Sequence, residues 1–589
     1  MNLQILEHES YQVLSDRNRI HIRPITPTRG LIYDRNGVLL AQNLPSFSLD
    51  IVPEQIEDMD DTIKQLAEII TISEGDINTF KAGLKKASRR HKAVSLRSRL
   101  SEEEIARFAV NRHRFTGVDT VARLYRHYPH GNLGVHALGY VGRINERELQ
   151  QIDPTNYEGT DYIGKTGLEK FYEDLLHGEV GIEQIETNAQ GRTLRALGST
   201  APIPGLNLHL SLDIELQRIA ENAFGENNGA LVAIDPANGD VVAMVSMPTF
   251  DPNLFVEGIN SKTYKALQDS HSQPLFNRAL RGRYPPGSTI KPFFGLAGLE
   301  YGLIQPGVRT VCPGWYMLEN DERKYRDWKK QGHGLVNLTG ALVESCDVYF
   351  YDLALTLGID RLSEFMEPFG LNDLTGIDTS GELTGLMPSR EWKQKKRHQP
   401  WFPGETLITG IGQGFLLTTP LQLASATAAL SRYGQQLRPR LVAATEDPGS
   451  NERVWLPAAP NVAVPVINEE NWEYIIRAMT KVVHSPRGTA RSISPGAKYK
   501  IAGKTGTAQV FGIKQDEEYV VEDIEKHLRD HALFIAFAPV ENPRIAVAVV
   551  VENGGSGGAV AAPIARKIMD HYLQSLARGK STINKGDNT

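Results

Sequence analysis

Hydrophobic and polar positions along the first part of the chain predict strands and turns, then helices, then strands again. Before about residue 50, proline and glycine interrupt short apolar stretches, and Asp34-Arg-Asn-Gly37 is a turn signal between two of them. Between about 52 and 112, apolar residues recur at helical spacing, as in Glu57–Ile70, and Ser101 stands where a capping serine would begin a helix. We therefore expect a helical subdomain there.

The stretch that follows mixes short strands with one clear helix, Gly167–Leu176. The segment Ala196–Gly205 is rich in small residues and proline, a composition typical of a loop or linker. We take residues 1–205 as one N-terminal unit that ends in this segment.

A second, larger unit follows over residues 206–576. Leu206–Leu212 alternates like a strand, and Asp213 is placed to cap the helix that comes next. Two pairs of strands stand at the two ends of this unit: Ala230–Ile234 with Val241–Val245, and Ala532–Phe537 with Ile545–Val551. Strand pairs at both ends with helices between them predict an α+β domain with one antiparallel sheet. A helix from Ala561 to about Leu573 closes it, and we expect the tail 577–589 to be disordered.

Length and composition agree with a folded protein of more than one domain. The chain has 589 residues, too many for one hydrophobic core, with 41% hydrophobic and 23% charged residues. A formal net charge of −6 and the lack of a strongly basic block argue against nucleic acid as a partner. No apolar run approaches the roughly 20 residues that span a bilayer, and the first residues do not resemble a signal peptide.

The strongest local signal for chemistry is Tyr284-Pro-Pro-Gly-Ser-Thr-Ile-Lys-Pro-Phe293. Its prolines and glycine predict a sharp turn, after which a helix starts at Ser288. Lys291 then lies one turn further along the same face, with its amine near the serine oxygen. A lysine that is partly removed from water can act as the base that turns a serine into a nucleophile. The same spacing also occurs where the serine is only a helix cap.

The tripeptide Lys-Thr-Gly occurs twice, in different contexts. Lys165-Thr-Gly167 opens an amphipathic helix, and we assign it a structural role. Lys504 lies in a strand with a glycine on either side, followed by Thr505, Gly506 and Thr507. A strand edge with small residues lets a substrate backbone pair alongside it. Thr505, Gly506 and Thr507 are therefore candidate substrate contacts, and Lys504 is a candidate for holding a carboxylate.

Three catalytic motifs, Ser288-x-x-Lys291, Ser345-Cys-Asp347 and Lys504-Thr-Gly506, follow one another in the order found in penicillin-recognising serine enzymes. Further motifs are Arg29-Gly-Leu-Ile-Tyr-Asp-Arg-Asn-Gly37, Gly164-Lys-Thr-Gly-Leu-Glu169, Gly191-Arg192 and Gly410-Ile-Gly-Gln-Gly414. On these motifs, which cover nearly the whole length, the chain resembles the class B penicillin-binding proteins. Asp347 stands where most relatives have asparagine, and in this the chain resembles the elongation type of Gram-negative bacteria.

This resemblance implies a fold and a reaction. Residues 1–205 would be a non-catalytic pedestal of strands and helices, with a helical head at about 52–112. Residues 206–576 would be a transpeptidase domain like that of the serine β-lactamases. The implied activity is that of a peptidoglycan D,D-transpeptidase of cell elongation, which cross-links stem peptides through a serine acyl-enzyme and is inhibited covalently by β-lactams. No organic cofactor is implied.

The resemblance also implies a role for each catalytic residue. Ser288 would attack the penultimate carbonyl of D-Ala-D-Ala with Lys291 as its base, and Ser345 would relay a proton to the leaving nitrogen. Lys504 would polarise that path. The oxyanion hole would use the backbone N–H of Ser288 and one from the strand that carries Thr507.

Outside the catalytic domain, Arg29, Asp34, Glu169 and Arg192 are expected to interlock and to have structural roles. The family carries an N-terminal membrane helix, and residues 3–18 resemble the segment just after it. We therefore expect a truncated chain whose parent is anchored in the inner membrane and faces the periplasm. A glycan polymerase of the RodA type and other elongation proteins are the implied partners.

Cys312, Asp327, His333 and Cys346 fall between the first two catalytic motifs, each in a turn-like context. Zinc takes thiolate, imidazole and carboxylate ligands in a tetrahedron, and a loop with little apolar content would gain order from it. Three alternatives stay open: a Cys312–Cys346 disulfide in an oxidising compartment, two separate buried thiols, and a nucleophilic cysteine. The last is disfavoured because Ser288 already has its base.

Other functions fit parts of the pattern. A D,D-carboxypeptidase or a β-lactamase would use the same serine but would not need the long pedestal. A division-type transpeptidase is disfavoured by Asp347. A non-catalytic scaffold of the elongation complex is disfavoured by the intact Ser288, Lys291 and Lys504.

Overall fold

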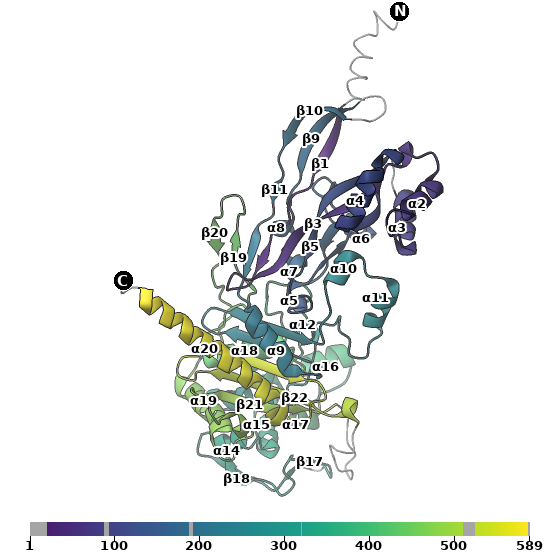
Figure 1. Cartoon of the computed structure of the whole chain (residues 1–589). Coiled ribbons are helices and arrows are strands. Elements are labelled where there is room, and N and C mark those ends of the chain that lie inside the picture. The colour runs from purple at the N-terminus through teal and green to yellow at the C-terminus, as the bar shows by residue number, and fades with distance from the viewer. Residues whose placement is uncertain (1–19, 87–92, 188–192, 320, 511–524, 587–589) are drawn as a thin grey trace, which may run out of the picture.

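The computed structural model describes residues 20–86, 93–187, 193–319, 321–510 and 525–586. These residues form an elongated molecule, in which the strands and helices of the N-terminal part lie beyond one end of a larger α+β unit (Figure 1). Among the described residues, no helix is both long and apolar enough to cross a bilayer.

A five-stranded antiparallel sheet forms the centre of the larger unit. Its strands, in order across the sheet, are β14 (Asp240–Met247), β13 (Gly229–Asp235), β23 (Ile545–Val551), β22 (His531–Ala538) and β21 (Ala502–Ala508). β13 pairs with β23, which joins the first and the last strand pairs of the domain. The predicted α+β domain with one antiparallel sheet is confirmed.

Alternate residues of β13 enter two different cores. Val232 and its neighbours Ala230 and Ile234 pack with α13 (Lys291–Glu300) and α18 (Pro420–Ser431) on one face. Leu231 and Ala233 pack with α9 (Ile214–Phe224) and α20 (Ala562–Gly586) on the other. Because successive residues of a strand point to opposite faces, the sheet is buried between two layers of helices.

A second sheet runs through both parts of the chain. Its strands, in order, are β20 (Arg453–Trp455), β19 (Val442–Glu446), β12 (Asn207–Leu210), β2 (Ile32–Tyr33), β3 (Leu39–Ile51) and β4 (Val94–Leu100), with β5 (Val118–His127) also paired to β3. β12 is parallel to β2 on one side and antiparallel to β19 on the other. The backbone hydrogen bonds of this sheet therefore hold the N-terminal part against the larger unit.

The head at 52–112 is not wholly helical, which corrects the sequence prediction. It contains α2 (Met59–Ala67), α3 (Glu74–Lys86) and α4 (Glu102–Asn111), and also β4, which pairs antiparallel with β3. The buried Leu96 and Leu100 are four residues apart, a spacing that fits one face of a helix or of a strand. Backbone pairing with β3 selects the strand. The predicted cap of α4 is confirmed, since Ser101 and Glu104 form a capping box.

Two further expectations are wrong. The segment expected to be a loop contributes to β10 (Thr193–Thr200) and β11 (Ile203–Pro204), which pair with β9 (Gly181–Thr187) and β8 (Gly178–Glu179). The backbone N–H and C=O groups of this segment find partners in the neighbouring strands, and the pattern of apolar side chains does not indicate such pairing. The tail expected to be disordered from 577 continues α20 to Gly586, because no proline follows Pro563 to interrupt it. Residues 587–589 lie outside the described residues.

A buried cluster of charges holds the pedestal together. It is centred on α7 (Gly167–Phe171) and α8 (Glu173–His177), which replace the single helix expected at 167–176. Arg29 Nε donates to Glu169 Oε2 at 2.8 Å and Arg126 Nε donates to Glu169 Oε1 at 2.7 Å. Arg29 also donates to Glu173 at 2.7 Å. Burial raises the pKa of the Glu169 carboxyl, but Arg126 and Arg29 together lower it below its ordinary value.

The expected charge network is therefore confirmed for Arg29 and Glu169 and wrong for Asp34. Asp34 instead accepts hydrogen bonds from the N–H groups of Asn36 and Val38 within its own turn. It also accepts one from Ile214, the first residue of α9. Arg192 lies outside the described residues.

Glu169→Gln should lower the free energy of unfolding by about 3–5 kcal/mol, because it removes the carboxylate that pairs with the buried Arg126 and leaves Arg29 with Glu173 alone. The lowered pKa means that the carboxylate stabilises the folded state above the ordinary carboxyl pKa. This stabilisation is lost as the pH falls through the lowered value, so the two proteins should converge in acid. Urea unfolding at a series of pH values measures both effects. Glu103→Gln, in an exposed ion pair with Arg107, is the control and should change little.

Candidate active site

A tight turn places Ser288 at the start of the buried helix α13. Ser288 lies in η4 (Gly287–Ile290), a 3-10 turn that passes into α13 at Lys291, so the helix begins three residues later than expected. Gly287 has φ +52°, and a Cβ atom there would lie 2.5 Å from the carbonyl oxygen of Thr507 on β21. Only glycine allows this approach. Ser288 is half-buried and forms no side-chain hydrogen bond within the described chain, which leaves its Oγ available to a substrate.

Lys291 is fully buried and points at the second motif. Its Nζ donates to Asp347 Oδ1 at 2.6 Å and to the carbonyl oxygen of Ser345 at 3.0 Å. Ser345 Oγ lies 3.5 Å from the same nitrogen. The serine and lysine motif is thus joined to the second motif by a short ion pair and a hydrogen bond.

Lys504 reaches the same serine from β21. Its Nζ donates to Ser345 Oγ at 2.8 Å and to the carbonyl oxygen of Thr505 at 2.9 Å. Burial, and next the positive charge of Lys291, lower the pKa of Lys504 well below its ordinary value, and Asp347 opposes this only in part. The hydroxyl of Ser345 therefore stands between two amines, one of which gives up its proton easily. Such an arrangement can carry a proton.

The second motif occupies a strained loop between α14 (Leu338–Val343) and α15 (Asp347–Met366). Ser345 has φ +57°, a left-handed conformation that costs energy for a residue with a Cβ atom. The two lysines hold its carbonyl and hydroxyl groups, and Cys346 N–H donates to the carbonyl of Ala341 at 2.9 Å. Strain of this kind persists where surrounding contacts over-determine the backbone.

β21 carries the candidate substrate contacts at the edge of the five-stranded sheet. Thr505 is 8% exposed and shares a hydrogen bond of 2.7 Å with Thr489, whereas Thr507 is exposed. A Cβ atom at Gly506 would lie 2.8 Å from the Thr289 side chain, so glycine lets η4 pack against the strand. One edge of β21 pairs with β22, and no strand in the described part of the chain pairs with the other edge, which an extended peptide can therefore approach.

The four candidate metal ligands converge. One donor atom from each of Cys312, Asp327, His333 and Cys346 lies within 4.8 Å of all the others. Cys312 Sγ is 3.5 Å from both Asp327 Oδ2 and His333 Nδ1. Both thiols are free and buried, which shows no disulfide between them. Burial, and then the Asp327 carboxylate, raise the pKa of the Cys346 thiol.

Asp327 connects this cluster to the loop that carries the second motif. Its Oδ2 accepts hydrogen bonds from the backbone N–H groups of Asp347 at 2.8 Å and Val348 at 3.2 Å, the first residues of α15. A carboxylate at the N-terminus of a helix satisfies donors that have no partner within the helix and complements the helix dipole. Asp347 Oδ2 in turn accepts from Trp328 N–H at 3.2 Å. The cluster and the second motif thus share hydrogen bonds.

Sequence reasoning missed several contacts of the site. Trp328 and Thr489 have no motif around them that indicates a role. Gln413 lies in the Gly410–Gly414 motif, and its Nε2 donates to the carbonyl oxygen of Thr507 at 3.0 Å. The pairing of Asp347 with Lys291 was also unforeseen, because these residues are 56 positions apart.

Known families and proteins match almost the full length of the chain. The family model of the penicillin-binding protein transpeptidase domain matches residues 229–570, and that of the penicillin-binding protein dimerisation domain matches residues 24–210. The peptidoglycan D,D-transpeptidase MrdA of Acinetobacter baumannii is 44% identical over 99% of this chain and 85% of its own length. MrdA of Escherichia coli K12 is 43% identical over 97% of this chain and 90% of its own length.

Two solved structures are similar to this chain over most of its length. PBP2 of Pseudomonas aeruginosa, in complex with WCK 5153, is 43% identical with a TM-score of 0.72, covering 94% of this chain and 97% of that one. PBP2 of Helicobacter pylori, in complex with MreC, is 31% identical with a TM-score of 0.80, covering 94% of this chain and 99% of that one.

Ser345→Gly and Ser345→Ala separate backbone strain from chemistry. Both remove the hydroxyl that Lys504 contacts, so both should slow acylation by a fluorescent penicillin by about 100-fold. Only glycine accepts the left-handed backbone freely, so the glycine variant should be about 1 kcal/mol more stable than the alanine variant. Thermal unfolding of the two variants measures this difference. Equal stability would contradict the assignment of strain to Ser345.

Proposed function

The chain belongs to the class B penicillin-binding proteins of the elongation type, and we propose that Ser288 is the nucleophile of this peptidoglycan D,D-transpeptidase. The observation that carries the assignment of residues is the convergence of Lys291 and Lys504 on Ser345, next to the turn that presents Ser288. The names of the matched relatives favour transpeptidation over hydrolysis or a scaffold role.

Acylation begins with attack of Ser288 Oγ on the carbonyl of the penultimate D-Ala of a stem peptide. Lys291, one helical turn further on, first passes its own proton through Ser345 Oγ to Lys504 and then, as a neutral amine, takes the hydroxyl proton. The proton reaches the nitrogen of the terminal D-Ala by way of Ser345 Oγ, which both lysines approach. The bond between the carbonyl carbon and that nitrogen breaks, D-Ala leaves as an amine, and the peptide remains as an ester on Ser288.

Backbone N–H groups stabilise the oxyanion of this step. The N–H of Ser288 and that of Thr507 are the candidates, and the close approach of Gly287 to Thr507 supports this pairing. Thr507 is the exposed hydroxyl on the strand and can bind the terminal carboxylate, whereas Thr505 is occupied by Thr489.

Deacylation needs an amine from a neighbouring stem peptide. The amine attacks the ester carbonyl and returns a proton to Ser288, and the two peptides become cross-linked. A β-lactam acylates the same serine but leaves slowly, because its opened ring keeps the leaving group attached to the acyl-enzyme.

A structural zinc ion fits the cluster beside this site. Bond lengths of about 2.3 Å to sulfur and 2.0 Å to nitrogen, at a tetrahedral angle, place two such ligands about 3.5 Å apart. Cys312 Sγ and His333 Nδ1 lie 3.5 Å apart. His333 Nδ1 and Asp327 Oδ1 are separated by the same distance. Cys312, Asp327, His333 and Cys346 would hold the ion, which supplies no reacting group and stabilises the loop through Asp327.

The partner we propose is a glycan polymerase of the RodA type, at the periplasmic face of the inner membrane. A related structure, 30% identical with a TM-score of 0.71, comes from a peptidoglycan synthase complex that coordinates polymerisation and cross-linking. It covers 96% of this chain and 94% of that one. The pedestal is the natural surface for this coupling, because the sheet that contains β2 and β12 connects it to the catalytic domain.

Ser288→Ala should abolish both covalent labelling by a fluorescent penicillin and the cross-linking of lipid-linked precursor in the presence of a RodA-type polymerase. The exposed Ser261→Ala variant is the control and should keep both activities. Gel fluorescence measures the first readout and chromatography of digested product the second. Labelling that persists in Ser288→Ala would overturn the choice of nucleophile.

Removal of zinc should destabilise the protein. Elemental analysis should find one zinc ion per chain, and a chelator should lower the midpoint of thermal unfolding by at least about 5 °C. The chelator should have no such effect on Cys312→Ser, whereas the exposed His271→Ala variant should respond like the parent. A zinc-free protein whose peptide map shows Cys312 bonded to Cys346 would contradict the metal assignment.

A further inference from the structure

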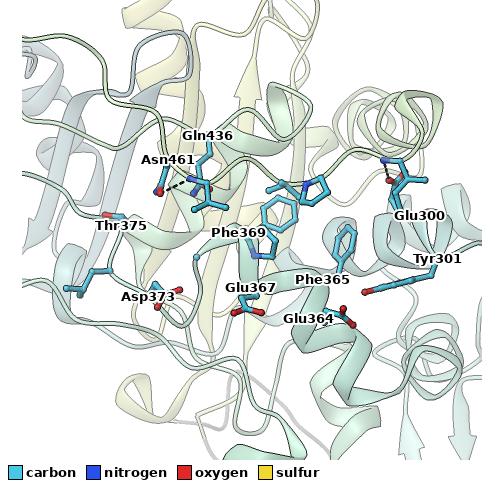
Figure 2. Close-up of a pocket in the computed structure, with 17 residues that line it drawn as sticks. Glu300, Tyr301, Glu364, Phe365, Glu367, Phe369, Asp373, Thr375, Gln436 and Asn461 are labelled. Carbon is cyan, nitrogen blue, oxygen red and sulfur yellow. Dashed lines mark hydrogen bonds between the residues drawn. The ribbon is translucent and has the colours of Figure 1, made fainter.

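A cavity of about 530 Å³ lies at the C-terminal end of α13. Figure 2 shows it between the end of α15 with η5 (Glu367–Phe369) on one side and the segment 461–467 on the other. Glu300 and Tyr301 close one end of it. α13 has ten residues and is therefore about 15 Å long, with Lys291 at its other end. None of the lining residues belongs to the Ser288 site or to the metal cluster.

Aromatic rings form one wall of the cavity. The ring centroids of Tyr301 and Phe365 are 6.1 Å apart, and those of Phe365 and Phe369 are 5.9 Å apart. Val462 and Ile467, on the opposite segment, are 68% and 72% exposed. Apolar side chains that stay exposed around a concave apolar site mark a surface that binds something.

The lining carries only negative charge. Glu300, Glu364, Glu367 and Asp373 line the cavity, and among its described lining residues there is no lysine, arginine or histidine. Glu300 is occupied, since its Oε2 accepts from Ile467 N–H at 2.7 Å. Glu367 and Asp373 are exposed and form no ion pair within the described part of the chain.

Glu364 lies next to the aromatic wall. Burial, and then the charge of Glu364, raise the pKa of Tyr301. Arg361, one turn before Glu364 on α15, opposes this rise and lowers the pKa of Tyr301, but it does not line the cavity. A positive group in the cavity would therefore meet ring faces and carboxylates together.

We propose that this cavity binds an amphipathic cation, a compact apolar body that carries an ammonium group. The apolar body would fill the space between Phe369, Val462 and Val464. The ammonium group would lie over the rings of Tyr301 and Phe365 and near Glu364 and Glu367, because ring faces and carboxylates both attract a cation. An anionic or a purely apolar ligand gains nothing from these carboxylates.

Such a ligand would contact the helix that carries the catalytic lysine. The ring of Phe369 packs edge-to-face on Phe293 of α13, with centroids 5.1 Å apart. Glu300 is the last residue of the same helix. A bound ligand should therefore raise the thermal stability of the catalytic domain while the Ser288 cleft stays open.

Three probes with one body test the proposal: 4-phenylbutylamine, 4-phenylbutanol and 4-phenylbutyrate. Calorimetric titration of the whole chain at low salt should show the amine binding about tenfold more tightly than the alcohol, with the carboxylate weakest. The double variant Glu364→Gln, Glu367→Gln should remove the advantage of the amine and keep the binding of the alcohol. Glu103→Gln, an exposed carboxylate in the head, is the matched control and should change neither.

Val462→Trp, at the rim, should weaken all three probes by filling the cavity. Acylation of Ser288 by a penicillin should leave the affinity for the amine unchanged. The proposal is overturned if the amine and the alcohol bind equally or if neither binds. Loss of amine binding after acylation would also overturn it, because the probe would then occupy the Ser288 cleft.

Discussion

The buried ion pair between Lys291 and Asp347 is the contact on which the arrangement of the catalytic domain depends. A buried ammonium group costs several kcal/mol unless a counter-charge and hydrogen bonds compensate for it. The helices α13 and α15 must therefore pack so that Lys291 Nζ reaches the carboxylate, at 2.6 Å. Lys504 approaches from β21, and its lowered pKa follows from burial and from this first cation. The single carboxylate of Asp347 compensates for the charge of only one of the two lysines, so the other can be neutral and can accept the proton that the proposed mechanism moves.

Two structural links extend this arrangement outwards. Asp327 accepts hydrogen bonds from the first N–H groups of α15, so the loop that holds Cys312 and His333 also positions Asp347. The sheet that contains β12 and β2 joins the pedestal to the catalytic domain, and the buried Glu169 fixes the pedestal strands and helices nearby. Local order at the active site is thus tied to the rest of the molecule by hydrogen-bonded backbone and by buried charge.

The fold was predictable where short-range interactions decide it. Asp213 caps α9, and β13 with β14 and β22 with β23 form antiparallel pairs, because caps, turns and alternation are local signals. The strand β4 was included in the predicted helical head because the helical signals of Glu57–Ile70 and Ser101 lie on either side of it, and only pairing with β3 selects the strand. The helical end of α20 was missed for a related reason, because a polar composition alone does not exclude a helix that continues from a packed one.

By itself, the sequence determined the family, the order of the three catalytic motifs and a set of four candidate metal ligands, because these depend on residue type and spacing. The tertiary structure alone decided which groups touch. It brought Lys504 to Ser345 across 159 residues, paired Lys291 with Asp347, placed Arg126 rather than Asp34 beside Glu169, and gathered the four candidate metal ligands within 4.8 Å of one another. The physical reason is that such contacts arise from the packing of distant elements, where burial and charge compensation select one partner among many with equally suitable chemistry.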